Sequence, residues 1–319
     1  MDGGDSGSGA SAETEAGVVG EAPASSSAKG DDAAKPEPPP HPKQSPLYHA
    51  HHADRYHRQE LIKNYEAFTG AKLLAAIDVI DIDFVLNIEE HLQGETGDRE
   101  LHVLLRSPGG DGEQAIRAIR VLQSRCSKLV FVIPDMAKSA ATLLALGADE
   151  IHLGPASDLG PIDPQMNIGG RWYAAKDVIS AIEQAEQAVS QNRSLTPLWA
   201  NLLAEVTALD VRAARAELDR TEYMIRQALG YRTDPPTHEQ TETLVSGLLK
   251  ALQEETTTHA TTLGPGELKN LGLPVVNVDP NSWTWQCIWR LWALYWVQIK
   301  GPIYESLLAS YRLSGPQPA

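Results

Sequence analysis

Two apolar segments, Leu101–Leu105 and Leu129–Ile133, each run into a short turn and then into a helical pattern. This order predicts a strand–turn–helix unit that occurs twice, with the two strands parallel in one sheet. Both turns then lie at the carboxyl edge of that sheet, where α/β proteins place their chemistry. We therefore expect an α/β fold whose functional site forms where the two turns meet.

The residues of these two turns are suited to acyl transfer. The first turn is Ser107–Gly110 and the second is Asp135–Ser139, so Ser139 stands where a helix begins. Backbone N–H groups at a helix start lack intrahelical partners and favour negative charge. The N–H of Ala140 is one candidate donor to a developing oxyanion, and that of Gly110 is the second, because glycine permits the backbone twist required. The alternative is that Ser139 only caps its helix, as serines commonly do.

Composition excludes several classes of function. The chain has 319 residues and a net charge of −15, which argues against nucleic-acid binding because phosphate contacts need a basic footprint. Its two cysteines, Cys126 and Cys287, are too few for a Cys-rich metal site, and we expect neither a metal nor a cofactor. No phosphate-binding GxxxxGK motif is visible. No secretory signal pattern is visible either, so we expect a soluble, cytoplasmic protein.

The sequence predicts three regions. Residues 1–46 are rich in Gly, Ser, Ala, Pro and acidic residues, which predicts a disordered tail. Residues 47–278 form the main domain, and residues 279–319 form a Trp-rich C-terminal extension. Four tryptophans of this extension recur at i, i+4, i+7 and i+11 and predict one helical stripe: Trp285, Trp289, Trp292 and Trp296. Core or oligomer packing is the favoured role of the stripe, and membrane contact is the alternative.

Helical patterns frame the main domain on both sides. Tyr48–Phe68 predicts an amphipathic helix. Its several histidines suggest a metal site, but no acidic or cysteine complement with zinc-site spacing accompanies them, so a polar helix face is favoured. After a Gly/Pro-rich loop, Ala174–Val189 and Leu198–Leu229 each predict one helix. A short helix and a returning strand are expected between His259 and Val278.

Two motifs carry a family resemblance. SPGGDGEQA (residues 107–115) and MAKSAATLLALGADEIHLGPASDLGPIDPQ (residues 136–165) resemble the ClpP-class serine peptidases. The resemblance is greatest to the serine dehydrogenase proteinase family, which is related to signal peptide peptidase A, and it covers Tyr48 to Val278. It implies a ClpP/crotonase-like spiral of βα units with added C-terminal helices, Ser139 as the nucleophile, an oxyanion hole from Gly110 and Ala140, and a homo-oligomer.

The sequence offers two arrangements for the general base, a lysine or a histidine. ClpP has a histidine where this sequence has Asp163 and the two residues that follow it. The signal peptide peptidase relatives instead use a lysine before a long helix, a place that Lys176 occupies here. A lysine base has to be neutral, which burial or neighbouring positive charge favours. The second arrangement is a Ser–His–Asp triad that uses His152 or His259 with Asp163.

The sequence thus predicts a serine endopeptidase that cuts peptides or proteins through an acyl-enzyme on Ser139, with Lys176 as base. One alternative is a non-catalytic scaffold that keeps the ClpP fold and binds partners. Another is a crotonase-type acyl-CoA enzyme, which the acidic composition disfavours. No energy-coupling ATPase element is visible, so an unfoldase would have to be a separate chain.

Overall fold

The computed structural model describes residues 45–254, 262–298 and 300–307. The chain divides into two units, residues 1–46 and residues 47–319, and the second unit carries the fold described below. The tail that the sequence predicts to be disordered lies outside the described residues, apart from its last two positions.

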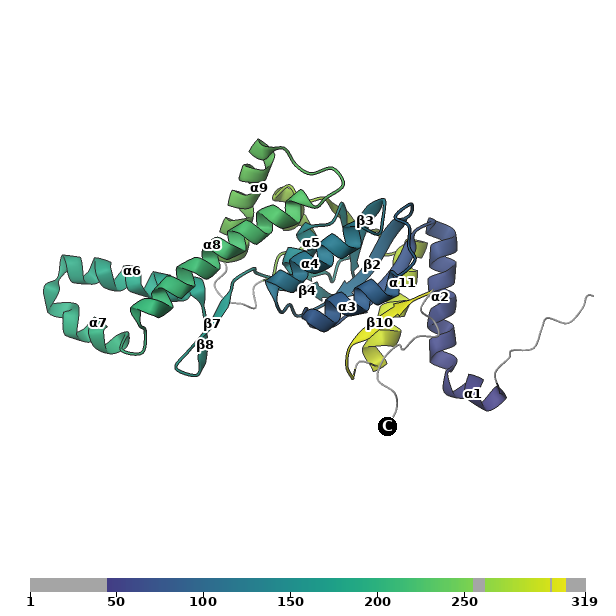
Figure 1. The fold of residues 1–319 in the computed structure, drawn as a ribbon, viewed down its shortest axis with the longest axis horizontal. Helices are drawn as coiled ribbons and strands as arrows, with labels where there is room; N and C mark the ends of the chain where they lie inside the picture. Colours follow the sequence, from purple (N-terminus) through teal and green to yellow (C-terminus); the bar gives the residue numbers. More distant parts are fainter. Residues whose placement is uncertain (1–44, 255–261, 299, 308–319) are drawn as a thin grey trace, which may run out of the picture. The chain divides into compact units, whose positions relative to one another are not determined.

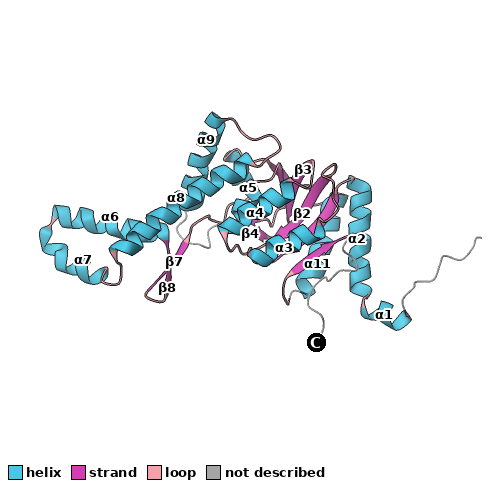
Figure 2. Cartoon of the chain, viewed as in Figure 1, coloured by secondary structure: helices cyan, strands magenta, loops and turns pink. Residues whose placement is uncertain are grey.

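A six-stranded sheet forms the centre of the second unit (Figures 1 and 2). Its strand order is β10-β1-β2-β3-β5-β9, and every neighbouring pair is parallel except β10 with β1. The strands are β1 (Lys72–Ile77), β2 (Glu100–Arg106), β3 (Lys128–Ile133), β5 (Glu150–Leu153), β9 (Val275–Asn277) and β10 (Ile303–Ser306). The predicted α/β fold is confirmed.

Helices cover both faces of this sheet, so its central strands are buried on both sides and read as continuous apolar runs. On one face lie α3 (Ile82–His91), α4 (Gly112–Gln123), α5 (Ala140–Leu146) and the last part of α8 (Ala208–Gly230). On the other face lie α2 (Ala53–Thr69) and α11 (Trp283–Gln298). Outside these layers lie α1 (Pro46–His51), α9 (His238–Leu249), a π-helical turn (Lys250–Glu254), α10 (Pro265–Asn270) and the helices of the arm described below.

The Trp-rich segment belongs to this core. Helix α11 packs against α2, and β10, which follows it, completes the sheet beside β1. All four tryptophans lie in one helix, as predicted, but only two of them pack in the core: Trp285 and Trp292 are 6% and 5% exposed, whereas Trp289 and Trp296 are 45% and 58% exposed. The buried face of α11 also includes Ile288, Leu291 and Tyr295, so the line of tryptophans does not coincide with the buried face. No helix of the described residues has the length and apolarity to cross a membrane.

An arm built from the segment after β5 extends beyond the sheet (Figure 1). It consists of the hairpin β7 (Gln165–Ile168) and β8 (Arg171–Ala174), α6 (Ala175–Gln191), a short 3-10 turn (Arg193–Leu195), α7 (Thr196–Leu202) and the first part of α8. A separate small core holds the arm together, with Ile168, Ala175, Val178 and Ala214 buried. The arm therefore has its own packing and does not depend on the main core alone.

Two features of the arm differ from the sequence-based expectation. The single helix expected over Leu198–Leu229 is broken, because Thr207 and Asp210 form a reciprocal capping box that starts α8 anew. The Gly/Pro-rich loop leads into a hairpin that was not predicted. Its turn consists of Gly169 and Gly170, both with positive φ (59° and 83°), as tight hairpin turns of type I′ require.

Candidate active site

Ser139 occupies a strained turn between β4 (Met136–Ala137) and α5. Its φ of 52° makes it the one non-glycine residue with positive φ in the described part of the chain. Such a conformation costs on the order of 1–3 kcal/mol and clusters at functional sites. The side chain makes no capping hydrogen bond to α5, so the alternative that Ser139 is simply a helix cap is wrong. The hydroxyl is therefore not used to stabilise the helix.

Backbone hydrogen bonds on both sides hold this turn in place. The N–H of Ser139 donates to the Pro161 carbonyl at 3.1 Å, and the N–H of Lys138 donates to the Ser107 carbonyl at 3.1 Å. The buried hydroxyl of Thr142 donates to the carbonyls of Ala137 and Gly160, both at 2.9 Å. The surrounding structure thus fixes the strained conformation, as the persistence of strain requires.

The glycine turn lies directly against Ser139. A Cβ atom added to Gly109, which has a φ of 106°, would lie 2.7 Å from the Ser139 Cβ and 2.6 Å from the Lys138 carbonyl oxygen. A Cβ added to Gly110, which has a φ of 144°, would lie 2.2 Å from the Ile80 carbonyl oxygen. Only glycines allow this approach. The prediction that both turns meet at the carboxyl edge of the sheet is confirmed.

Two backbone N–H groups beside Ser139 are not used by the secondary structure. The bridge between Ile80 and Gly110 consists of bonds from Ile80 N–H to the Gly109 carbonyl and from Asp111 N–H to the Ile80 carbonyl, both 2.8 Å. This pattern leaves the N–H of Gly110 out of the bridge. The N–H of Ala140 is the first of α5, so it has no carbonyl within the helix to bind.

A cavity of about 410 Å³ opens beside these groups. Its lining residues come from several elements: Pro108 and Gly110 of the glycine turn, Gly112 of α4, Ser139 just before α5, Ala140 and Leu143 of α5, the segment 162–165, Trp172 of the hairpin, and Glu217, Thr221 and Met224 of α8. The structure therefore brings Ser139, Gly110, Ala140 and Asp163 to one cavity. The Asp163 side chain is buried there, and the Gln165 amide donates to it at 3.4 Å.

The wall that α8 contributes was missed from the sequence. Glu217, Thr221 and Met224 have the i, i+4, i+7 spacing of one helix face, which is the signal available in the sequence. That spacing does not say which site the face covers. The structure adds that Met224 packs on Gly112 at the start of α4: a Cβ there would lie 2.9 Å from the Met224 methyl carbon.

Lys176 lies near the cavity but not in its wall. It stands in the first turn of α6 and is partly buried. The N–H of the preceding Ala175 donates to the carbonyl of Pro164, a cavity residue, at 2.9 Å. The start of α6 is thus tied to the cavity wall, while the Lys176 side chain is not among the lining residues.

The structure does not bring His152 to Ser139. Its Nε2 lies 2.9 Å from the Glu150 carboxylate, and its ring lies 6.0 Å from that of His102. His102 in turn contacts the Tyr65 hydroxyl at 2.7 Å, and burial, followed by the nearby His152, lowers the pKa of His102 to about 4. None of the described histidines lines the Ser139 cavity. His259 lies outside the described residues.

Lys138, which adjoins Ser139 in sequence, has a partner away from the cavity. The Lys138 amine lies 4.0 Å from the Asp158 carboxylate, and its side chain packs along Gly160. Burial raises the pKa of Asp158, and Lys138 opposes that effect. Within the described ranges, no group of three or more His, Cys, Asp or Glu side chains is arranged to hold a metal ion.

The class of the protein follows from its match to a known family. The model of the ClpP-like SDH-type serine proteinases matches residues 52–215, about half of the chain. The chain belongs to this family, so the family predicted from the two motifs is confirmed.

Individual relatives are distant. Two proteins of Methanocaldococcus jannaschii, both described as uncharacterized, are 27% identical to the chain over 152 and 134 residues. The chain spans about half the length of these curated relatives, 49% and 42%, and they match 47% and 42% of the chain.

Solved structures show a weak similarity. A mutant of the 1510-N membrane-bound stomatin-specific protease, solved with a substrate peptide, is 15% identical with a TM-score of 0.41, covering 66% of this chain and 75% of its own. ClpP1 from Listeria monocytogenes is 12% identical with a TM-score of 0.37, covering 69% and 96%. Similarity at this level carries no conclusion about function.

Proposed function

We propose that this protein is a serine endopeptidase that forms an acyl-enzyme on Ser139, with Lys176 as general base. One observation carries the proposal: Ser139 has a strained backbone and a hydroxyl that does not cap α5, and it lines a cavity together with Gly110 and Ala140. The N–H groups of these two residues are the proposed oxyanion hole, because they are not used by the bridge or by the helix.

The proposed reaction has two halves. The Ser139 hydroxyl attacks the scissile carbonyl carbon while the Lys176 amine accepts its proton, and the negative oxygen of the tetrahedral intermediate binds the two N–H groups. The C–N bond then breaks, and Lys176 returns the proton to the leaving amine. Water then attacks the acyl ester while the neutral Lys176 amine accepts its proton. Lys176 passes this proton to the Ser139 oxygen as the ester C–O bond breaks, which releases the carboxylic acid and restores the serine.

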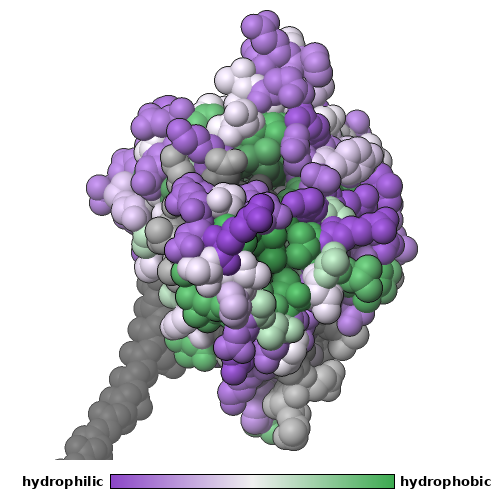
Figure 3. Space-filling model, turned by 90° about the vertical axis from the view of Figure 1, so that its left-hand side faces the viewer, coloured by the Kyte–Doolittle hydropathy of each residue, from purple (hydrophilic) through white to green (hydrophobic). Residues whose placement is uncertain are grey.

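Family membership and the exposed apolar side chains support the predicted homo-oligomer, which stays a prediction. Figure 3 views the unit from the α6–α7 end and shows apolar residues gathered in the middle of that face with hydrophilic residues around them. Among the large apolar side chains exposed on the arm are Leu198, Leu202 and Leu209. Apolar surface of this kind is typical of interaction sites.

A non-catalytic scaffold is the second candidate function. It is favoured by one observation, that Lys176 is not part of the cavity wall. The two functions differ in the reactivity of Ser139, which a covalent probe measures directly.

We expect a fluorophosphonate probe to label the wild-type protein at one site, because an activated serine attacks phosphorus as it attacks a carbonyl carbon. Intact-mass measurement should show one adduct, and peptide mapping should place it on Ser139. The Ser139→Ala variant should not be labelled, whereas Ser180→Ala, at an exposed serine of α6, should be labelled like the wild type. Labelling that persists in Ser139→Ala would overturn the nucleophile assignment, and an unlabelled wild type would favour the scaffold.

Replacing Lys176 with methionine should lower kcat/KM by roughly 10²- to 10⁴-fold, the usual contribution of a general base. Methionine keeps much of the side-chain volume and removes the amine. Rates of peptide hydrolysis measured across pH test this, with Lys63→Met as the exposed control on α2. The assignment is wrong if Lys176→Met keeps wild-type activity, and Lys138 becomes the base if Lys138→Met alone shows the loss.

A further inference from the structure

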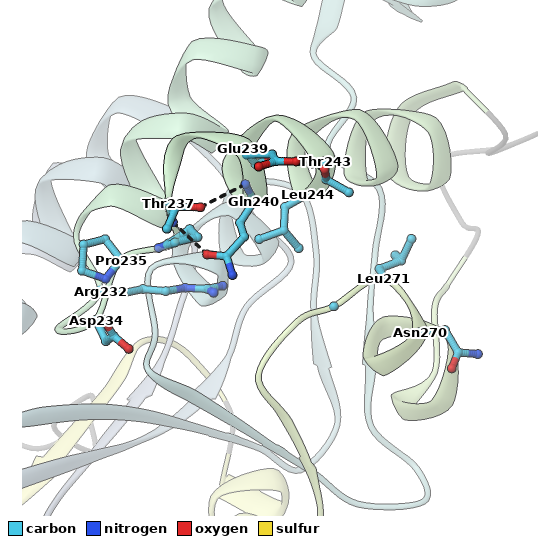
Figure 4. A pocket seen from close by; sticks show the side chains of 12 residues that line it. Arg232, Asp234, Pro235, Thr237, Glu239, Gln240, Thr243, Leu244, Asn270 and Leu271 are labelled. Atoms are coloured by element: carbon cyan, nitrogen blue, oxygen red, sulfur yellow. Dashed lines mark hydrogen bonds between the residues drawn. The ribbon is translucent and has the colours of Figure 1, made fainter.

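A second cavity, of about 830 Å³, lies on another side of the main core (Figure 4). It is formed by the connection between α8 and α9, the first half of α9 and the end of α10. It shares no lining residue with the Ser139 cavity. Its most distinctive member is Arg232, whose Nε donates to the Leu146 carbonyl at the end of α5, 2.9 Å away. The cavity thus lies at the opposite end of α5 from Ser139.

The guanidinium of Arg232 lacks an anionic partner. One of its terminal nitrogens is buried without an acceptor, and no carboxylate of the described residues lies within ion-pair distance of it. The carboxylate of Asp149 instead accepts the N–H groups of Leu129 and Thr233, both at 2.7 Å. Burial lowers the pKa of Arg232 to about 10, with Asp149 opposing. Arg232 as a whole is partly buried, and a guanidinium with one buried, unsatisfied nitrogen and no ion pair gains more from a bound anion than a fully solvated one does.

A second donor points to the same part of the cavity. The side-chain oxygen of Gln240 accepts the Thr237 N–H at 2.9 Å, so the orientation of this amide is fixed. Its NH₂ group therefore faces away from Thr237, and Figure 4 shows it directed toward the guanidinium of Arg232. The Gln240 NH₂ group and the Arg232 guanidinium cannot hydrogen-bond to each other, because both are donors only. Both residues line the cavity, so an acceptor supplied by a ligand there can accept hydrogen bonds from both side chains.

The other walls restrict what that ligand can be. Pro235, Leu244 and Leu271 supply apolar surface, which suits an aliphatic group. Asp234 and Glu239 also line the cavity and are exposed, so they oppose the binding of anions, and they oppose a multiply charged anion more strongly than a singly charged one. The polar and apolar walls together fit a single carboxylate attached to an aliphatic side chain.

We propose that this cavity is a binding site for a monocarboxylate with an aliphatic side chain, such as the C-terminal residue of a short peptide. The carboxylate accepts hydrogen bonds from Arg232 and Gln240, and planar guanidinium–carboxylate pairing is strong and directional. The aliphatic part packs against Leu244 and Leu271.

Calorimetry of the full chain with N-acetyl-alanyl-leucine tests this site. We expect one saturable site per chain for this acid, at least tenfold weaker binding of inorganic phosphate, and no binding of the matching amide, N-acetyl-alanyl-leucinamide. Arg232→Gln should weaken binding of the acid at least tenfold. The matched control is Arg226→Gln on α8, which removes an arginine that pairs with Glu222 and Glu242 and does not line the cavity.

A second variant separates loss of the site from loss of the fold. Thr243→Trp places a bulky ring at an exposed cavity position and leaves Arg232 unchanged, so it should also weaken binding at least tenfold. The proposal is overturned if the acid does not bind, if its amide binds equally well, if phosphate binds as tightly, or if both cavity variants bind like the wild type. Binding needs no turnover, so these results do not depend on the proposed peptidase activity.

Discussion

The Ser139→Ala variant is expected to lose at least about 10⁴-fold in kcat/KM while its free energy of unfolding stays within about 1 kcal/mol of wild type. Activity should fall because the hydroxyl is the proposed nucleophile. Stability should hold because that hydroxyl makes no capping bond to α5. A positive φ is as unfavourable for alanine as for serine, so the substitution leaves the backbone strain at residue 139 unchanged. Peptide hydrolysis rates and urea unfolding measure the two quantities.

Glycine at the same position isolates the strain. Ser139→Gly should be as inactive as Ser139→Ala, but more stable by about 1–2 kcal/mol, since relief of about 1–3 kcal/mol of strain exceeds the added entropy of the unfolded chain. The matched control is Ser157, a buried serine whose hydroxyl donates to the Ile133 carbonyl and accepts the Gly154 N–H. Ser157→Ala should show the opposite result, lower stability with activity retained at low temperature. Near-wild-type activity in Ser139→Ala, or a loss of stability as large as that of Ser157→Ala, would contradict the assignment.

The central part of the fold was predictable because local sequence and global fold agree there. Leu101–Leu105 and Leu129–Ile133 are apolar runs of the kind that only a doubly covered parallel strand can bury. Each is followed by a turn whose residues have few alternatives: Gly109 and Gly110 adopt positive φ, and Ser139 directly precedes a helix that opens with two alanines. Because the strand, turn and helix preferences of this segment all agree with one arrangement, few other topologies are compatible with its sequence.

The arm was less predictable because its boundaries depend on capping contacts. The periodicity of Leu198–Leu229 fits one helix, yet α7 ends at Leu202, and Thr207 and Asp210 satisfy each other's N–H groups at the start of α8. The turn at Gly169 and Gly170 likewise reverses the chain within a stretch that has no strong strand pattern.

The site was predictable only where it is local in sequence. Ser139, Gly110 and Ala140 lie on turns that the motifs mark, and the structure places them at one cavity. Glu217 reaches that cavity from a helix far along the chain, and its position depends on how α8 packs over α4. No sequence pattern encodes that packing. The same reasoning applies to Lys176, whose side-chain position depends on how the arm leaves the cavity wall.

Replacing Gly110 with alanine should lower the free energy of unfolding by roughly 3–6 kcal/mol, because a strained φ and steric overlap act together. The φ of 144° is unfavourable for alanine, and the new Cβ would lie 2.2 Å from the Ile80 carbonyl oxygen. This oxygen is backbone, so relief requires the loop before α3 to move. The N–H of Gly110 would then shift away from Ser139, and any protein that still folds should lose peptidase activity.

The control for this prediction is Gly70, which also has a positive φ (76°) but has nothing within 4 Å of an added Cβ. Gly70→Ala therefore measures the conformational cost alone, about 1–2 kcal/mol, with activity unchanged. The difference between the two variants in urea unfolding is the cost of the overlap with Ile80. If Gly110→Ala were no less stable than Gly70→Ala, the close approach of the glycine turn to Ile80 would not exist, and the proposed oxyanion hole would lose the contact that orients its Gly110 N–H.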